Sequence, residues 1–157
     1  MAPHVHEKID FTTSVCIVHE DRVLLHMHKK LHIWLLPGGH VELDEDPNES
    51  ALREAKEETG LEVELVGEAR SYDSPYNARE LILPKFLNRH FFDTTHTHEH
   101  VDLCYFARPL SDVSEARPEI EGADIRWFTR EELEKNEFGI VPDVRAHALA
   151  ALKELAS

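Results

Sequence analysis

The sequence has few basic residues for its length. Its 157 residues include 17 Lys and Arg against 31 Asp and Glu, which gives a net charge of −14 with the histidines neutral. A protein that binds a nucleic-acid polymer needs a basic surface for the phosphate backbone, so we expect no nucleic-acid polymer as a partner. A small phosphorylated substrate is compatible with this charge only where bound cations invert the local electrostatics.

Long apolar runs and cysteines are also scarce. No run approaches the roughly 20 apolar residues of a membrane-spanning helix, and the first residues do not resemble a signal peptide. We therefore expect no membrane partner and a cytoplasmic location. The two cysteines, Cys16 and Cys104, lie in apolar segments, which favours buried thiols over a disulfide. The length predicts a single domain over residues 1–157.

The sequence does contain a dense group of carboxylates between residues 39 and 61. A regular spacing, G-x5-E-x7-R-E-x-x-E-E-x-G, relates seven residues: Gly39, Glu45, Arg53, Glu54, Glu57, Glu58 and Gly60. Carboxylates this close repel one another unless a divalent cation lies among them, and oxygen ligands suit Mg²⁺ or Mn²⁺. The stretch therefore predicts a metal site for Mg²⁺, with Mn²⁺ as the alternative.

Local signals predict that these carboxylates lie on a helix over about residues 47–59. Asp46 is a suitable N-cap, Pro47 suits the first helical position, and Glu49 occupies the capping-box position. Gly60 suits the left-handed residue that closes a helix. Residues three and four apart share a face, so the glutamates form an acidic face and the alanines an apolar back that packs on a sheet.

A solvated surface helix rich in ion pairs is the alternative explanation for such a run. It leaves Glu54 and Glu58 unexplained, because like charges four residues apart destabilise an exposed helix. It also does not account for Glu45, eight residues ahead of Arg53. Because a guanidinium is a rigid bidentate donor, we expect Arg53 to hold Glu45.

The seven-residue pattern, with Ala55 and Leu61 at two apolar positions, resembles the signature of the Nudix hydrolases. The resemblance implies an α+β fold, in which a mixed β-sheet lies between helices as an α/β/α sandwich and carries a metal-binding loop-helix-loop. It also implies hydrolysis of a pyrophosphate bond in a nucleoside diphosphate linked to another group, by attack of water on phosphorus. Dimers are common in this family, so a homodimer is one candidate assembly.

Carried over residue by residue, the resemblance implies four metal contacts: the side chains of Glu54, Glu57 and Glu58, directly or through water, and the backbone carbonyl of Gly39. The pair of Arg53 and Glu45 then orients the loop and the helix without binding the metal.

The general base is left open. The resemblance offers Glu54 or Glu58, or an acid outside the pattern in the loop before Trp127. Glu121 is the candidate for that outside acid and Glu119 the runner-up, with a solvated loop glutamate as the alternative explanation for Glu121.

The twelve histidines suggest a second question. One explanation is a metal cluster formed by His96, His98 and His100 with Glu99 and Asp102. In an extended strand, His98, His100 and Asp102 point to one face. The alternative is a polar sheet face near the substrate, with Asp102 hydrogen-bonded to a histidine, and we favour it.

The rest of the chain supports the α+β class. Alternation and residue type predict strands over residues 11–19, 22–28, 61–69, 89–94, 98–108 and 123–128, helices that start at Arg130 and over 141–155, and a long irregular segment over 71–88.

The substrate is the least determined feature. Candidate substrate-binding residues are His28, Lys30, Trp34 and Tyr76. The first hypothesis is a Mg²⁺-dependent pyrophosphohydrolase of nucleoside triphosphates, including oxidised ones. The alternatives are a pyrophosphatase of ADP-ribose or another nucleoside diphosphate sugar, and a nucleotide-sensing module without turnover.

Overall fold

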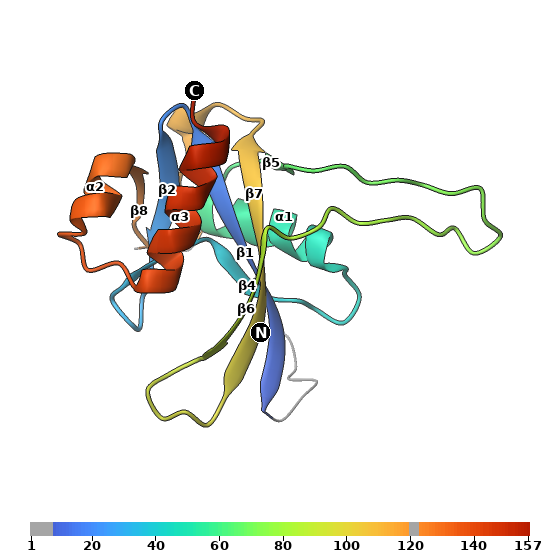
Figure 1. Ribbon diagram of the computed structural model, residues 1–157, viewed down its shortest axis with the longest axis horizontal. Coiled ribbons are helices and arrows are strands. Elements are labelled where there is room, and N and C mark those ends of the chain that lie inside the picture. The colour runs from blue at the N-terminus through green and yellow to red at the C-terminus, as the bar shows by residue number, and fades with distance from the viewer. Residues whose placement is uncertain (1–7, 120–122) are drawn as a thin grey trace.

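A mixed β-sheet with helices on both faces forms the body of the protein (Figure 1). The computed structural model describes residues 8–119 and 123–157. Over these ranges the eight strands are β1 (Ile9–His19), β2 (Arg22–Met27), β3 (Trp34–Leu35), β4 (Gly38–His40), β5 (Val63–Leu65), β6 (Phe86–Phe91), β7 (Glu99–Pro109) and β8 (Ile125–Thr129). The helices are α1 (Pro47–Thr59), α2 (Arg130–Lys135) and α3 (Pro142–Leu155), with a 3-10 turn at Val113–Glu115.

The two long strands β1 and β7 pair in parallel at the centre of the sheet. The other pairings are antiparallel: β1 with β2 and β4, β2 with β3 and β8, and β7 with β5 and β6. β1 pairs with β2 only beside their turn, at Val18↔Val23 and His19↔Arg22. Beyond that point β1 takes β4 as its partner and β2 takes β3, so the strands diverge and leave room for a cleft.

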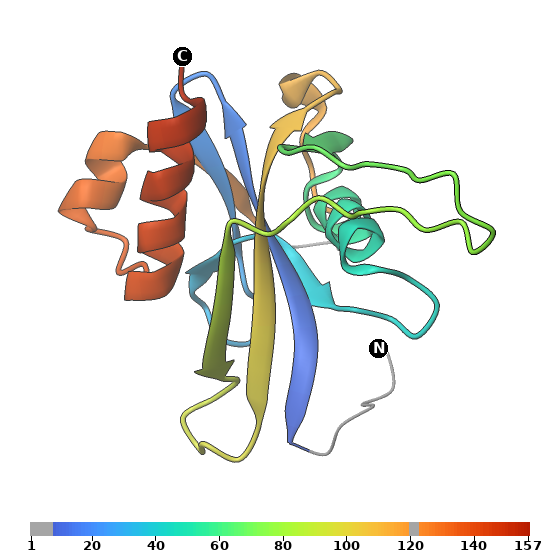
Figure 2. The same ribbon diagram turned by 45° about the vertical axis from the view of Figure 1, so that its right-hand side comes forward.

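Alternate residues of β1 enter two separate cores. Cys16 and Val18 pack in the core beneath α2 and α3, whereas Val15 and Ile17 pack in the core beneath α1. Figure 2 shows α1 and α3 on opposite sides of the sheet. This alternation is the period of two of a strand that is buried on both faces. The α/β/α sandwich with a mixed sheet, expected from the sequence, is therefore confirmed.

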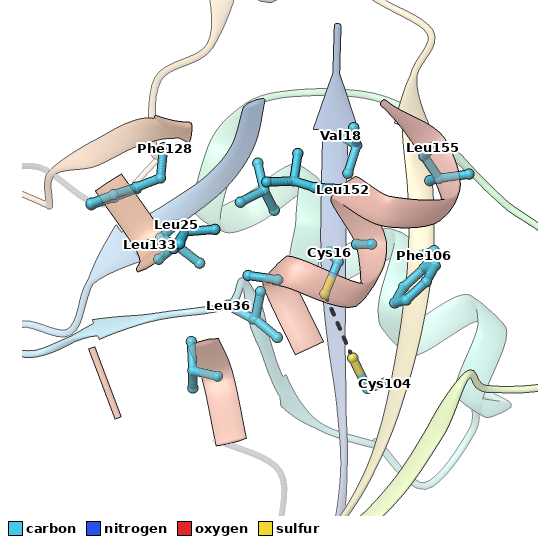
Figure 3. Packing of buried hydrophobic residues seen from close by; sticks show 14 of the residues in the cluster. Cys16, Val18, Leu25, Leu36, Cys104, Phe106, Phe128, Leu133, Leu152 and Leu155 are labelled. Atoms are coloured by element: carbon cyan, nitrogen blue, oxygen red, sulfur yellow. Dashed lines mark hydrogen bonds between the residues drawn. The ribbon is translucent and has the colours of Figure 1, made fainter. Parts of the chain in front are cut away.

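The cysteines lie in the core beneath α3. Cys16 and Cys104 are both free and buried, and their sulfur atoms are 3.8 Å apart (Figure 3). The prediction of buried thiols is confirmed.

The segment after β5 departs from the sequence prediction. A strand over residues 61–69 is wrong beyond Leu65, because Gly67 takes a φ of +148° and the chain then leaves the sheet. Residues 66–85 form a long arm that projects from the body (Figures 1 and 2), with one isolated bridge at Ser71↔Arg79. The last residues of the predicted irregular segment belong to β6, which starts at Phe86.

Within the described ranges, residues 8–119 and 123–157, none of the helices has the length and apolar character needed to cross a membrane.

Candidate active site beside the acidic helix

The acidic helix α1 begins and ends where the sequence predicts. The Asp46 carboxylate accepts a hydrogen bond from the Glu49 backbone N–H at 3.0 Å, and the Glu49 carboxylate accepts one from the Asp46 backbone N–H at 2.8 Å. Gly60 closes the helix at φ 74°. Ala51 and Ala55 are fully buried against the sheet, whereas Glu54, Glu57 and Glu58 are only partly buried.

Arg53 uses all five of its N–H donors. Nε and one N–H of Nη2 donate to the two oxygens of Glu45, at 3.0 and 2.6 Å, as the predicted bidentate pair. The other Nη2 hydrogen bond goes to the carbonyl of His40 at 3.0 Å. Nη1 donates to Glu54 at 2.8 Å and to Glu57 at 3.3 Å. Arg53 therefore joins the loop after β4 to the helix.

Two adjacent glycines let β4 approach both β1 and α1. A Cβ on Gly38 would lie 2.9 Å from the Cα of Ser14 and closer still to the carbonyl oxygen of Thr13. A Cβ on Gly39 would lie 2.6 Å from the carboxyl carbon of Glu54. A Cβ at residue 38 would thus clash with backbone atoms, whereas a Cβ at residue 39 would clash with a glutamate side chain of the acidic face.

Glu58 is the most electrostatically strained member of this face. Its carboxylate accepts a hydrogen bond from the Gly38 backbone N–H at 2.8 Å and lies 3.2 Å from Nε2 of His26. Burial, together with the charges of Glu54 and Glu57, raises the pKa of Glu58 to about 8. Burial also lowers the pKa of His26 to about 4, so His26 does not supply the compensating charge.

The same shortage of positive charge affects Glu54. Burial raises its pKa, against the opposing effect of Arg53, and the neighbouring carboxylates raise it further. One guanidinium is shared among Glu45, Glu54 and Glu57. A hard divalent cation with oxygen ligands would stabilise the ionised forms, so this donor set fits Mg²⁺ or Mn²⁺. Within the described part of the chain, the three glutamates do not converge on one point, because Arg53 holds Glu54 and Glu57.

A cleft of about 770 Å³ opens beside this face. Its walls come from the diverging strands β1 and β2, from β4, from β6 and β7 with the turn between them, and from the start of α3. Glu58, Gly38 and Gly39 line one part of it, and His28 lines it from the end of β2. Two of the four predicted metal contacts, Gly39 and Glu58, therefore share a cleft with one predicted substrate-binding residue, His28.

The other predicted substrate-binding residues lie elsewhere. Trp34 packs edge-on against Phe128, with ring centroids 5.2 Å apart. Lys30 is exposed in the turn after β2. Tyr76 is 90% exposed in the projecting arm. None of these three side chains lines the cleft in this structure.

The candidate outside acid, Glu121, lies outside the described residues. The loop that leads to it is anchored on the end of α1: the backbone N–H of Arg117 donates to the carbonyl of Thr59 at 2.8 Å, and that of Glu119 donates to the carbonyl of Glu57 at 3.0 Å. This brings Glu119, the runner-up, beside the acidic helix.

In the histidine-rich strands, the structure corrects the predicted partner of Asp102. Asp102 accepts hydrogen bonds from the hydroxyls of Thr12 at 2.8 Å and Ser14 at 2.5 Å, so the predicted bond from a histidine is wrong. The carboxylate that faces the histidines is Asp10, which lies 2.7 Å from Nε2 of His98 and 3.2 Å from Nε2 of His40.

Sequence analysis missed Asp10 and the contact of His26 with Glu58. Both depend on segments that are far apart in the chain, and neither residue belongs to a spaced pattern. The alternation of β1 places Asp10 on the face of Thr12, but only the pairing of β1 with β7 brings it to the histidines.

Comparison with known proteins agrees with this architecture. The NUDIX domain family matches residues 10–148. A hydrolase of the NUDIX family from Clostridium perfringens, with a solved structure, is 36% identical, with 92% of this chain and 97% of that chain covered and a TM-score of 0.79.

Two further relatives are more distant. A probable DHNTP pyrophosphohydrolase from Lactococcus lactis subsp. cremoris is 27% identical over 130 residues, which are 81% of this chain and 67% of that protein. The structure of a MutT NUDIX hydrolase from Burkholderia pseudomallei, 22% identical, shares the fold with a TM-score of 0.66 over 96% of this chain and all of that one. The family match and the Clostridium relative show that the chain belongs to the Nudix hydrolase family.

Proposed function

We propose that this Nudix hydrolase is a Mg²⁺-dependent pyrophosphohydrolase. Its substrates are triphosphates of a nucleoside or of a similar heterocyclic group. The observation that carries the proposal is the pair of half-buried carboxylates Glu54 and Glu58 on α1, of which Glu58 lines the cleft. Burial and neighbouring carboxylates raise the pKa of both. Arg53 donates to Glu54 but shares its charge with Glu45 and Glu57, and His26, 3.2 Å from Glu58, has a pKa lowered to about 4. Such a site gains most from a divalent cation, and a phosphate substrate needs the same cation because the protein is strongly acidic.

The chain's own residues have separable roles in this proposal. Glu54, Glu57 and Glu58, with the carbonyl of Gly39, hold the metal. Mg²⁺, when bound, supplies charge neutralisation on the phosphate oxygens and an acidified water.

Positioning falls to the residues around these ligands. Arg53 and Glu45 set the distance between the loop and the helix, and the Gly38 N–H orients Glu58. His28 lines the cleft, and burial and the charge of Lys30 lower its pKa, which favours the neutral imidazole. The general base is Glu54 or Glu58, or an acid of the loop after Arg117.

The triphosphate class has one supporting relative, the probable DHNTP pyrophosphohydrolase from Lactococcus. DHNTP therefore joins the nucleoside triphosphates as a candidate substrate. Pyrophosphatase activity on ADP-ribose or another nucleoside diphosphate sugar stays the alternative. A sensing module without turnover is disfavoured, because all seven residues of the pattern are present.

A substrate panel tests the proposal. Nucleoside triphosphates, oxidised nucleoside triphosphates, DHNTP and ADP-ribose are incubated with the protein and Mg²⁺, and the phosphorylated products are measured. Glu57→Gln removes a proposed ligand, and Glu64→Gln changes an exposed glutamate of β5 as the matched control. We expect turnover of a triphosphate by the wild type and Glu64→Gln, with a large loss in Glu57→Gln.

Two results would overturn it. Turnover of ADP-ribose alone would move the protein to the diphosphate-sugar class. Full activity in Glu57→Gln would remove Glu57 from the metal site. A homodimer and a cytoplasmic location stay predictions from the sequence, and light scattering of the same sample measures the first.

A further inference from the structure

Polar side chains from neighbouring strands meet at one end of the sheet, where β1, β6 and β7 extend together below α1 in Figure 1. Asp10 of β1 is directly opposite His100 of β7, and His100 is directly opposite His90 of β6. Residues directly opposite one another share a face of a sheet, and so do residues two apart in an extended segment. His98, which precedes β7, therefore lies on the same face as His100.

Distances within this group suit a metal ion. Nε2 of His98 is 2.7 Å from the carboxylate of Asp10. One ligand atom from each of Asp10, His98 and His100 lies within 4.8 Å of the other two. Nitrogen and oxygen ligands of a tetrahedral Zn²⁺ at 2.0–2.1 Å are about 3.3 Å apart. Small rotations of the side chains would therefore bring the three atoms around one ion.

His100 carries an unexplained polar atom. Its Nε2 is buried and has no hydrogen-bond partner among the residues that the structure describes. Buried polar side-chain atoms normally have a partner, so this nitrogen requires an explanation. A metal ion beside Asp10 would accept its lone pair. Asp10 itself is 4% exposed, and a buried carboxylate is normally paired or bound to a cation.

We propose that Asp10, His98 and His100 bind a borderline-soft divalent metal ion such as Zn²⁺. Two imidazoles and one carboxylate are ligands for Zn²⁺ and similar transition metals, whereas Mg²⁺ prefers oxygen alone. Three protein ligands leave a coordination position. His40 is adjacent to it, with Nε2 3.2 Å from the Asp10 carboxylate and its ring centroid 5.1 Å from that of His100.

The ion has two structural consequences. It cross-links the ends of β1 and β7, the longest strand pair of the sheet. It also borders the cleft, because His40 and His100 are among the residues that line it. The site stands independently of the proposed function, since none of its ligands belongs to the acidic helix.

Metal titration of the whole chain tests this site. The protein is stripped with EDTA, dialysed, and kept in millimolar Mg²⁺ so that the glutamates of α1 are not available to the added ion. Zn²⁺ is then titrated by calorimetry, and Co²⁺ by its visible absorption, which is strong only in low-symmetry or tetrahedral sites. We expect one equivalent of either ion per chain, a tetrahedral Co²⁺ spectrum, and a higher melting temperature with Zn²⁺.

Variants locate the ion. Replacing a residue that only hydrogen-bonds to a metal ligand costs about 10- to 100-fold in metal affinity. Replacing a ligand itself, in His98→Gln or His100→Gln, should therefore weaken Zn²⁺ binding by at least about tenfold. The matched control is His32→Asn, an exposed histidine in the loop after β2 whose positive φ suits asparagine. It should bind as the wild type does. Glu57→Gln should also keep its Zn²⁺ equivalent.

Three outcomes would overturn the site. The first is no Zn²⁺ equivalent in the wild type in the presence of Mg²⁺. The second is wild-type affinity in His98→Gln, which keeps His100 and so decides the question even where His100→Gln fails to fold by circular dichroism. The third is loss of the Zn²⁺ equivalent in a variant with only His4 and His6 replaced by Gln, which would place the ion on those two histidines.

Discussion

Two adjacent alanine substitutions should separate the metal site from the fold. Gly39→Ala places a methyl group 2.6 Å from the carboxyl carbon of Glu54. Carbon atoms ordinarily stay about 3.5 Å apart, so Glu54 must withdraw by about 1 Å. A metal ligand tolerates displacements of about 0.2 Å, and a misplacement of about 1 Å near the reacting groups costs on the order of 100-fold in rate. Only the far end of a flexible side chain moves, so the stability of the metal-free protein should change little.

Gly38→Ala should instead lower the stability of the metal-free protein. Its methyl group would lie 2.9 Å from the Cα of Ser14 and nearer still to the carbonyl oxygen of Thr13, both backbone atoms of β1. Backbone in a paired strand cannot withdraw, so β4 must leave β1, and Glu58 loses the N–H of residue 38. Overpacking of this kind costs about 1–3 kcal/mol or more, which for a chain of this size lowers the melting temperature by roughly 2–4 °C per kcal/mol.

The assay is the same for both variants. Circular dichroism in EDTA gives the melting temperature of the metal-free protein, and calorimetric titration with Mn²⁺ gives the metal affinity. Turnover of the best substrate in the panel gives kcat. Gly39→Ala should lose metal affinity and kcat at nearly unchanged melting temperature. Wild-type metal affinity in Gly39→Ala, or a melting temperature for Gly38→Ala no lower than that of Gly39→Ala, would refute the reasoning.

Three further predictions concern an ion pair, a titration and the thiols. Arg53→Lys reduces five engaged donors to three and removes the bidentate fork, so urea unfolding should show a loss of about 1–3 kcal/mol, and an unchanged free energy of unfolding would contradict it. Lys30→Gln should raise the pKa of His28, measured by NMR titration of the imidazole, because a nearby positive charge is removed. His28 should then stay protonated to a higher pH than in the wild type, and a fall would reverse the sign of the argument. Cys16 and Cys104 should not react with a thiol reagent in the native state and both should react in guanidinium, whereas rapid native labelling would show that the core beneath α3 opens.

The acidic helix was accessible to sequence reasoning because its determinants are local. Asp46, Glu49 and Gly60 define its ends through contacts within a few residues, and the structure has the same ends. The pair of Arg53 and Glu45 spans eight residues and follows from the shape of the guanidinium. The segment after Leu65 was not accessible in this way. Its first residues have strand-like character, but the backbone turns at Gly67, so the irregular segment that the sequence predicts from residue 71 begins earlier, directly after Leu65.

What the sequence by itself determined is the family, the helix and the set of carboxylates, because each is encoded by residues that follow one another at intervals of at most eight positions along one segment. Only the tertiary structure decided which groups share a site. Glu58 meets the Gly38 N–H across 20 residues, and Asp10 meets His98 across 88. These contacts depend on the pairing of β1 with β4 and with β7, which is set by the two cores and the strand register together. A histidine on a strand can face solvent, a hydroxyl or a carboxylate, and the neighbouring strand selects among them.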